Sequence, residues 1–167
     1  NYLYNSCSVY INLASNEGFG LGSLEALTVG TPIVVNVTGG LQDQCGFKKN
    51  GKYLTSDDYI ELGSNHRGTY KEHGEWVEPV FPSNVSLQGS PLTPYIFDDR
   101  VQYEDAGEAL LKWYKKNSEQ MQSASKKGME YVNSKNIGMT SLNMGNKFIE
   151  SMESAFKNWK PREKYTL

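Results

Sequence analysis

The chain has 167 residues, with 17 Lys and Arg against 19 Asp and Glu, and a formal net charge of −2. This length suits one domain, and the nearly balanced charge argues against a disordered chain and against the basic surface of a nucleic-acid-binding protein. No apolar run reaches the roughly 18 residues that a transmembrane helix needs. The two cysteines, Cys7 and Cys45, have neither zinc-binding spacing nor a disulfide framework, so we expect a reducing, cytoplasmic environment.

Residues 1–58 predict a core in which strands and helices alternate. Residues 8–13 are rich in β-branched and aromatic side chains and predict a strand, and residues 22–29 predict a helix. The apolar run 33–35 predicts a second strand, buried on both faces of a parallel sheet. A strand, a loop, a helix and a strand in this order are typical of a doubly wound α/β sheet that binds ligands at the carboxyl ends of its strands.

The rest of the chain does not continue this alternation. Residues 59–98 contain four of the six prolines and many large apolar side chains without a lasting period, so we expect an ordered but irregular insertion. Residues 99–159 return to helical spacing and predict C-terminal helices, followed by a tail at 160–167. We interpret Asp98 and Asp99 as a charge pair that leads into the first of these helices, rather than as a metal-binding motif.

The last predicted helix has the clearest apolar stripe of the chain. Phe148, Met152, Phe156 and Trp159 recur along it at helical spacing. Such a stripe usually marks packing in a core, and the alternative is a face built for a partner that the chain does not contain. We expect this face to be exposed and to support self-association through these four side chains.

A glycine-rich loop follows the first predicted strand. Gly18, Gly20 and Gly22 allow its backbone to approach a ligand closely. The N–H groups and the positive dipole at the start of the following helix suit a phosphate. Glu17 and Glu25 flank the loop, and carboxylates beside an anion site are best explained by hydroxyl partners, as in a nucleotide sugar. From the residues alone, a solvated helix carboxylate and a helix-dipole partner are the alternatives.

Three short sequences in and after this loop form a recognisable pattern. They are EGFGLGSLEA at 17–26, GTPIVV at 30–35 and GGL at 39–41. Together they resemble the signature of retaining GT-B glycosyltransferases of the family 4 type, with its Glu-x7-Glu motif. The resemblance implies a Rossmann-like α/β fold, namely the C-terminal, donor-binding domain of a two-domain enzyme. We therefore expect residues 1–167 to be a fragment that is incomplete at its N-terminus, lacks the acceptor domain and is inactive alone.

The resemblance also implies a role for each matched residue. Glu17, the catalytic candidate, would bond hydroxyls of the donor sugar and act by positioning and charge stabilisation, without being assigned as a nucleophile. Glu25 would accept the ribose hydroxyls, and the backbone after Glu17 would meet the sugar and the distal phosphate. The family needs no metal and no cofactor beyond its donor, here a UDP-, GDP- or ADP-sugar. The substrate-binding candidates are Glu17, Gly18, Phe19, Gly20, Leu21, Glu25, Gly39 and Gly40.

The chain departs from the family pattern in two places. After the Gly-Gly pair it has Gln42, Asp43 and Gln44, where the family often has Pro-Glu. The insertion at 59–98 is not part of the general pattern, and its role stays open. These departures leave the Glu-x7-Glu segment intact, so the donor-binding interpretation rests on that segment.

The implied activity is sugar transfer by a hexosyltransferase-type glycosyltransferase. The sugar would move from a nucleoside-diphosphate donor to an acceptor hydroxyl of a glycan, lipid or protein, with retention of configuration. For the full-length protein we also expect peripheral membrane association. One alternative is a nucleotide-sugar 2-epimerase of the same GT-B fold. Another is a non-catalytic domain that binds nucleotide sugars or serves in assembly.

Overall fold

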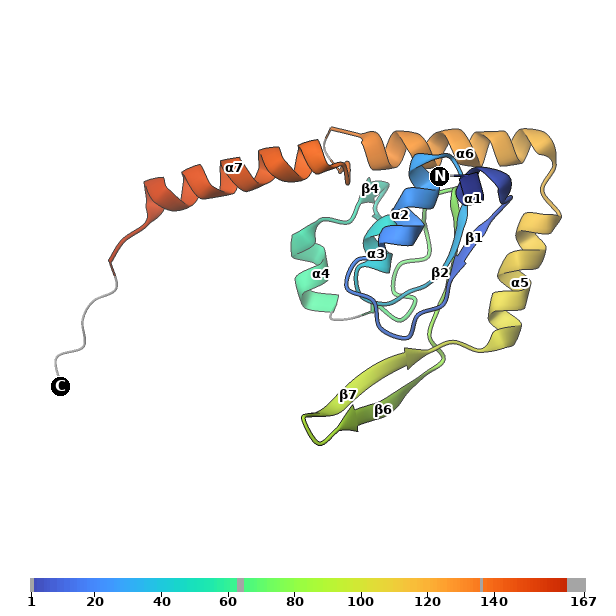
Figure 1. The fold of residues 1–167 in the computed structure, drawn as a ribbon, viewed down its shortest axis with the longest axis horizontal. Helices are drawn as coiled ribbons and strands as arrows, with labels where there is room; N and C mark the ends of the chain where they lie inside the picture. Colours follow the sequence, from blue (N-terminus) through green and yellow to red (C-terminus); the bar gives the residue numbers. More distant parts are fainter. Residues whose placement is uncertain (1, 63–64, 136, 162–167) are drawn as a thin grey trace.

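A three-stranded parallel sheet forms the centre of the protein (Figure 1). The computed structural model describes residues 2–62, 65–135 and 137–161. The strand order is β1-β2-β5, and Ile33 of the middle strand pairs with Tyr10 on one side and with Val77 on the other. The three strands are β1 (Tyr10–Asn12), β2 (Ile33–Asn36) and β5 (Val77–Val80).

Helices and two antiparallel hairpins surround this sheet. The helices of the first half are α1 (Tyr2–Ser6), α2 (Leu21–Thr28), α3 (Leu41–Gln44) and α4 (Ser56–Leu62). The C-terminal helices are α5 (Tyr103–Tyr114), α6 (Ser118–Asn133) and α7 (Ser141–Asn158). The hairpins pair β3 (Lys48–Lys49) with β4 (Lys52–Tyr53), and β6 (Asn84–Ser90) with β7 (Thr93–Arg100). The expected α/β fold, a parallel sheet flanked by helices, is confirmed.

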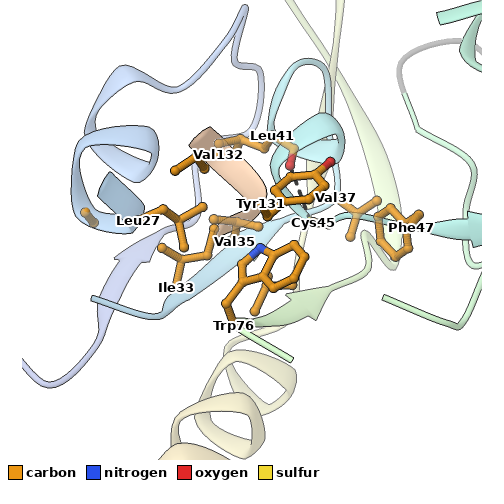
Figure 2. Packing of buried hydrophobic residues seen from close by; sticks show 12 residues of the cluster. Leu27, Ile33, Val35, Val37, Leu41, Cys45, Phe47, Trp76, Tyr131 and Val132 are labelled. Carbon is orange, nitrogen blue, oxygen red and sulfur yellow. Dashed lines mark hydrogen bonds between the residues drawn. The ribbon is translucent and has the colours of Figure 1, made fainter. Parts of the chain in front are cut away.

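The hydrophobic core lies on both faces of the sheet because successive side chains of β2 point to opposite sides. Ile33 and Val35 pack with Leu27 of α2 and with the end of α6, where Trp76 stacks on Tyr131 with ring centroids 4.5 Å apart (Figure 2). On the other face, Val34 packs in a second cluster with side chains of β5, α5 and α6. The buried members of that second cluster are Val34, Val80, Ala109, Trp113 and Ala124, and the partly buried Met121 packs against them.

The structure corrects the expectation of an irregular insertion at 59–98. Instead, β5 supplies the third strand of the parallel sheet, and β6 and β7 form a long hairpin. Pro79 is tolerated in β5 because this strand pairs with β2 on one side only, and an edge strand needs fewer backbone donors. The hairpin has no alternating apolar pattern because both of its faces are mostly exposed, and its register also shifts between Gln88 and Ser90. The boundary expected at residue 58 therefore does not separate the core from an appendage.

Helix α7 extends away from the body of the protein (Figure 1). None of its 18 residues is buried, and Phe148, Phe156 and Trp159 are 65%, 77% and 72% exposed. Thr140 caps its start by accepting a hydrogen bond from the backbone N–H of Asn143. Among the described helices, none is long and apolar enough to cross a membrane. The apolar stripe of α7 therefore has no cover among the described residues.

Candidate functional site

The glycine-rich loop connects the carboxyl end of β1 to the start of α2, and the Gly-Gly turn after β2 packs directly on it. The backbone N–H of Gly40 donates to the carbonyl oxygen of Glu17 at 3.0 Å. A Cβ on Gly39 would overlap that same oxygen, and a Cβ on Gly40 would overlap the carbonyl oxygen of Gly18. Only glycine permits this contact between two backbones. The structure thus brings together the two glycine segments that the sequence separates.

Gln44, at the end of α3, holds the second half of this loop. Its Nε2 donates to the carbonyl oxygens of Phe19 at 2.6 Å and Gly20 at 3.0 Å. Gly20 has φ +84°, and a side chain there would collide with Leu41. The sequence analysis named Gln44 only as a departure from the family pattern. The sequence around Gln44 carries no signal of this role, because its burial and its partners depend on the fold.

The two flanking carboxylates have different surroundings. Glu17 is half-buried, and no described residue makes a hydrogen bond or an ion pair with its carboxylate. Glu25 is exposed on α2 and accepts a hydrogen bond from the hydroxyl of Tyr4 at 2.9 Å. Glu25 lies one helical turn after Leu21, on the same side of α2. Both carboxylates retain oxygen lone pairs that could accept hydroxyl groups of a ligand.

Tyr4 is a second residue that the sequence analysis did not assign to the site. The hydrogen bond to Glu25 raises the pKa of the Tyr4 phenol, because the neighbouring carboxylate favours the protonated hydroxyl. The backbone oxygen of Tyr4 accepts from the hydroxyl of Thr31, and its ring packs edge-on against Tyr10. Helix α1 therefore restricts the position of Glu25 on α2.

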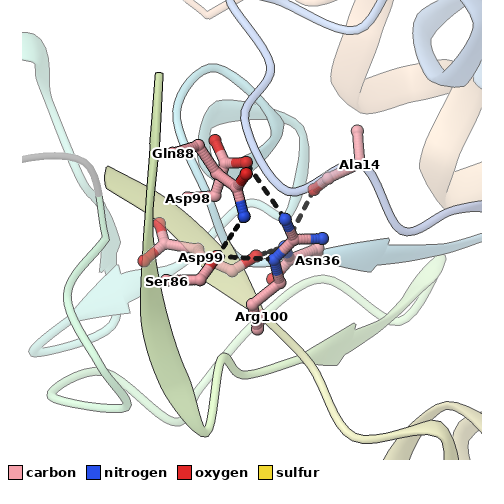
Figure 3. Close-up of polar contacts among 7 residues, drawn as sticks. All are labelled: Ala14, Asn36, Ser86, Gln88, Asp98, Asp99 and Arg100. Atoms are coloured by element: carbon pink, nitrogen blue, oxygen red, sulfur yellow. Dashed lines mark hydrogen bonds and ion pairs between the residues drawn. The ribbon is translucent and has the colours of Figure 1, made fainter. Parts of the chain in front are cut away.

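A buried aspartate fixes the base of the β6–β7 hairpin at the carboxyl end of β2. Asp99 is 4% exposed, and its two carboxylate oxygens accept from the hydroxyl of Thr38 and the amide of Asn65, both at 2.7 Å. Asn36 donates to the backbone oxygens of Ala14 and Asp99 (Figure 3). This network corrects the interpretation of Asp99 as part of a pair that leads into a helix, because Asp99 belongs to β7 and faces the sheet.

The other carboxylate of that pair points elsewhere. Asp98 forms an ion pair with Arg100 at 3.2 Å, and Arg100 also donates to Ser86 across the hairpin (Figure 3). Within the described ranges, no three His, Cys, Asp or Glu side chains come together where they could hold a metal ion. Asp98 and Asp99 therefore serve as structural partners of the hairpin and of the turn after β2.

A cavity of about 1140 Å³ opens beside the loop. The side chains of Phe19 and Leu21 line it, together with Tyr53, Tyr131 and Met144 from β4, α6 and α7. Its walls do not include Glu17, Glu25 or the Gly-Gly turn. The cavity therefore meets the loop through Phe19 and Leu21 and not through the two carboxylates.

One family model matches the part of the chain that contains this site. Residues 1–62 match the family model of the glycosyl transferases group 1. The match begins before β1, includes the glycine-rich loop and the Gly-Gly turn, and ends with α4, so it stops before β5 and the hairpin β6–β7. No curated protein sequence matches the chain significantly. The match supports a glycosyltransferase, and it includes every candidate site residue.

Proposed function

We propose that this chain is the donor-binding part of a retaining glycosyltransferase of the GT-B family 4 type. Glu17 would bond hydroxyls of the donor sugar, and Glu25 would bond the ribose hydroxyls. Between them, the backbone of residues 18–21 would meet the distal phosphate, and Gly39 and Gly40 would line the same cleft. The donor would be a UDP-, GDP- or ADP-sugar, used without a metal, and its hexose would pass to a hydroxyl of a glycan, lipid or protein.

One observation carries this proposal, namely the contact between the Glu17 loop and the Gly-Gly turn. The N–H of Gly40 donates to the oxygen of Glu17, and no described residue occupies the Glu17 carboxylate. This carboxylate keeps its oxygens available, and donor hydroxyls could bond to them. The match of residues 1–62 to the glycosyl transferases supports the same assignment.

Other parts of the proposal concern the whole protein. An upstream acceptor domain would complete the active site, and peripheral membrane association would belong to that longer chain. A cytoplasmic location is supported by Cys7 and Cys45, which are both free thiols. Self-association would use the stripe of Phe148, Met152, Phe156 and Trp159, all of which are exposed.

A panel of nucleotides tests the proposal on this chain. The melting temperature is recorded with UDP, GDP, ADP and with a sugar derivative of each. A ligand at 100 times its dissociation constant adds about 2.7 kcal/mol to the free energy of unfolding, so the shift is easily measured. We expect stabilisation by one of the three nucleotides and a further gain with its sugar derivative.

Two variants make this test specific. Glu25→Ala should abolish most of the stabilisation, because it removes the acceptor for the ribose hydroxyls. Glu108→Ala removes an exposed carboxylate of α5 that makes no hydrogen bond with the described residues, and it should leave the shift unchanged. Stabilisation that persists in Glu25→Ala, or a folded chain that no nucleotide stabilises, would contradict the proposal.

A further inference from the structure

The side chain of Gln44 donates to two consecutive peptide groups of the loop. Its Nε2 donates to the consecutive carbonyl oxygens of Phe19 and Gly20 at 2.6 and 3.0 Å. Both neighbours are acceptors, so the amide nitrogen and not the amide oxygen must face them. The carbonyl oxygen of Gly20 also accepts the backbone N–H of Leu24 in α2 at 3.2 Å, whereas Gln44 alone among the described residues donates to that of Phe19. Gln44 is fully buried and lies in a helix whose backbone also accepts the indole N–H of Trp76, which fixes the position of the amide.

In a trans peptide group the N–H points away from the C=O. The carbonyl of Phe19 shares its peptide group with the N–H of Gly20, and the carbonyl of Gly20 shares its group with the N–H of Leu21. Gln44 holds the carbonyl of Phe19, and Gln44 and Leu24 together hold that of Gly20, so both N–H groups turn to the opposite side of the loop. Neither N–H donates to an acceptor among the described residues. Two adjacent donors are thus left for a ligand at the start of α2.

We propose that Gln44 is a positioning residue that sets these two N–H groups for the distal phosphate of the donor. The inference rests on the proposed function for the identity of the ligand, but not for the orientation of the loop. This role explains why position 44 has a glutamine, although the Oε1 atom of Gln44 is buried without a hydrogen-bond partner among the described residues. A leucine would fill a similar volume without that unsatisfied oxygen, so the contribution of Gln44 lies in its two donated hydrogen bonds.

The first experiment needs no ligand. Backbone ¹⁵N relaxation of the whole chain reports the order of the Gly20 and Leu21 amides on the picosecond-to-nanosecond scale. We expect rigid values for the unsubstituted protein, with S² about 0.85. In Gln44→Leu the value for Gly20 should be clearly lower, and that for Leu21 should fall less because Leu24 still donates to its peptide group. The control is Met121→Ala, which loosens the cluster on the opposite face of the sheet and should leave both amides rigid. Unchanged order in Gln44→Leu would overturn the proposal.

The second experiment separates the phosphate from the rest of the nucleotide. Dissociation constants are measured for the mono- and diphosphates of uridine, guanosine and adenosine. The gain in affinity from monophosphate to diphosphate should fall about tenfold in Gln44→Leu, because charge-assisted hydrogen bonds to the distal phosphate are lost. Affinity for the monophosphate should stay within about twofold, since Glu25 still holds the ribose. An equal loss for both ligands would indicate a merely structural role and would overturn the proposal.

Gln44→Glu adds a third measurement, the pH dependence of the order of the Gly20 and Leu21 amides, which a merely structural role of Gln44 would not change. The variant's ionised carboxylate at high pH would face two carbonyl oxygens and would disorder the loop. Burial raises the pKa of such a carboxyl, and the protonated acid at lower pH would restore one donated hydrogen bond. The order of Gly20 and Leu21 should therefore recover as the pH falls, and an order that does not change with pH would argue against the proposal. If no nucleotide binds the unsubstituted chain, the proposed function fails, while the relaxation data still decide the role of Gln44.

Discussion

The glycine-rich loop and helix α7 are both clear sequence patterns, but their surroundings are opposite. The loop contacts the Gly-Gly turn through its backbone and α3 through Gln44, so neighbours hold it on two sides. Helix α7 has no buried residue and extends from the body with its apolar stripe exposed (Figure 1). An apolar pattern thus shows which face of an element is suited to burial, whereas the partner that buries it consists of residues elsewhere.

The sharpest test of this contrast compares two large apolar side chains. Leu27 is 1% exposed in the core, and Phe156 is 77% exposed on α7. Leu27→Ala should lower the free energy of unfolding by about 3 kcal/mol because it leaves a cavity. Phe156→Ala should change it by less than about 0.5 kcal/mol. Urea denaturation at low protein concentration measures both, and similar losses would mean that α7 is covered in solution.

Two glycines of the site provide the second test. Gly39 has φ +48° and faces the carbonyl oxygen of Glu17, whereas no atom lies within 4 Å of a Cβ placed on Gly18. Gly39→Ala should cost about 2 kcal/mol of unfolding free energy from backbone strain and displacement of the loop. Gly18→Ala should stay within about 0.5 kcal/mol of the unsubstituted protein. Equal costs would show that the contact between the two backbones does not stabilise the loop.

The pH dependence of stability tests whether the segment after α4 belongs to the enclosed region. His66 is 3% exposed, its ring contacts Phe47, Tyr70 and Phe81, and burial lowers its pKa. The neutral form is favoured in the folded state, so stability is complete above the unfolded pKa of about 6.5 and is lost as the pH falls below it.

Between pH 7 and pH 5.5 the free energy of unfolding should decrease by about 1 kcal/mol through this residue. Urea denaturation at a series of pH values measures the decrease. It should disappear in His66→Leu and persist in His73→Leu. A decrease that survives in His66→Leu must come from other groups and would contradict this assignment.

The smallest expected effect concerns Tyr4. Tyr4→Phe removes the hydrogen bond to Glu25 and leaves the ring packing on Tyr10 in place. The nucleotide that stabilises the chain should bind about threefold more weakly, because Glu25 becomes free to adopt other rotamers. Isothermal titration measures this change, and Tyr2→Phe on the same helix, 94% exposed, is the control. No change would show that the ligand itself orients Glu25.

The sequence predicted the elements that depend on neighbouring residues only. β1, α2 and β2 follow from residue type and spacing, although β1 is shorter than expected at Tyr10–Asn12. The contact between Gly39 and Glu17 was expected only through a shared cleft, and the structure adds the direct packing of the backbones. The candidate residues themselves could be named because their motif is contiguous.

Long-range partners could not be predicted in the same way. β5 contains Pro79, and only its position at the sheet edge makes this strand possible. Gln44 and Asp99 matter through contacts with residues 25 and 61 positions away, respectively, which no periodicity reveals. From the sequence, Asp98 and Asp99 form a charge pair. In the structure, Asp99 lies in β7 and accepts a hydrogen bond from the hydroxyl of Thr38.

The pairing of β5 with β2 also has a consequence for how the chain folds. Their contact joins segments that are far apart in the sequence, and α3, β3, β4 and α4 lie between them. Parallel pairing of this kind forms slowly, because the entropy cost of closing a long loop comes before any stabilising contact between the strands. A hairpin such as β6–β7 forms within about 1–10 μs, and helices form faster still. Closure of the sheet is therefore the expected rate-limiting step, and until it occurs the apolar residues of β2 lack one of their two neighbouring strands.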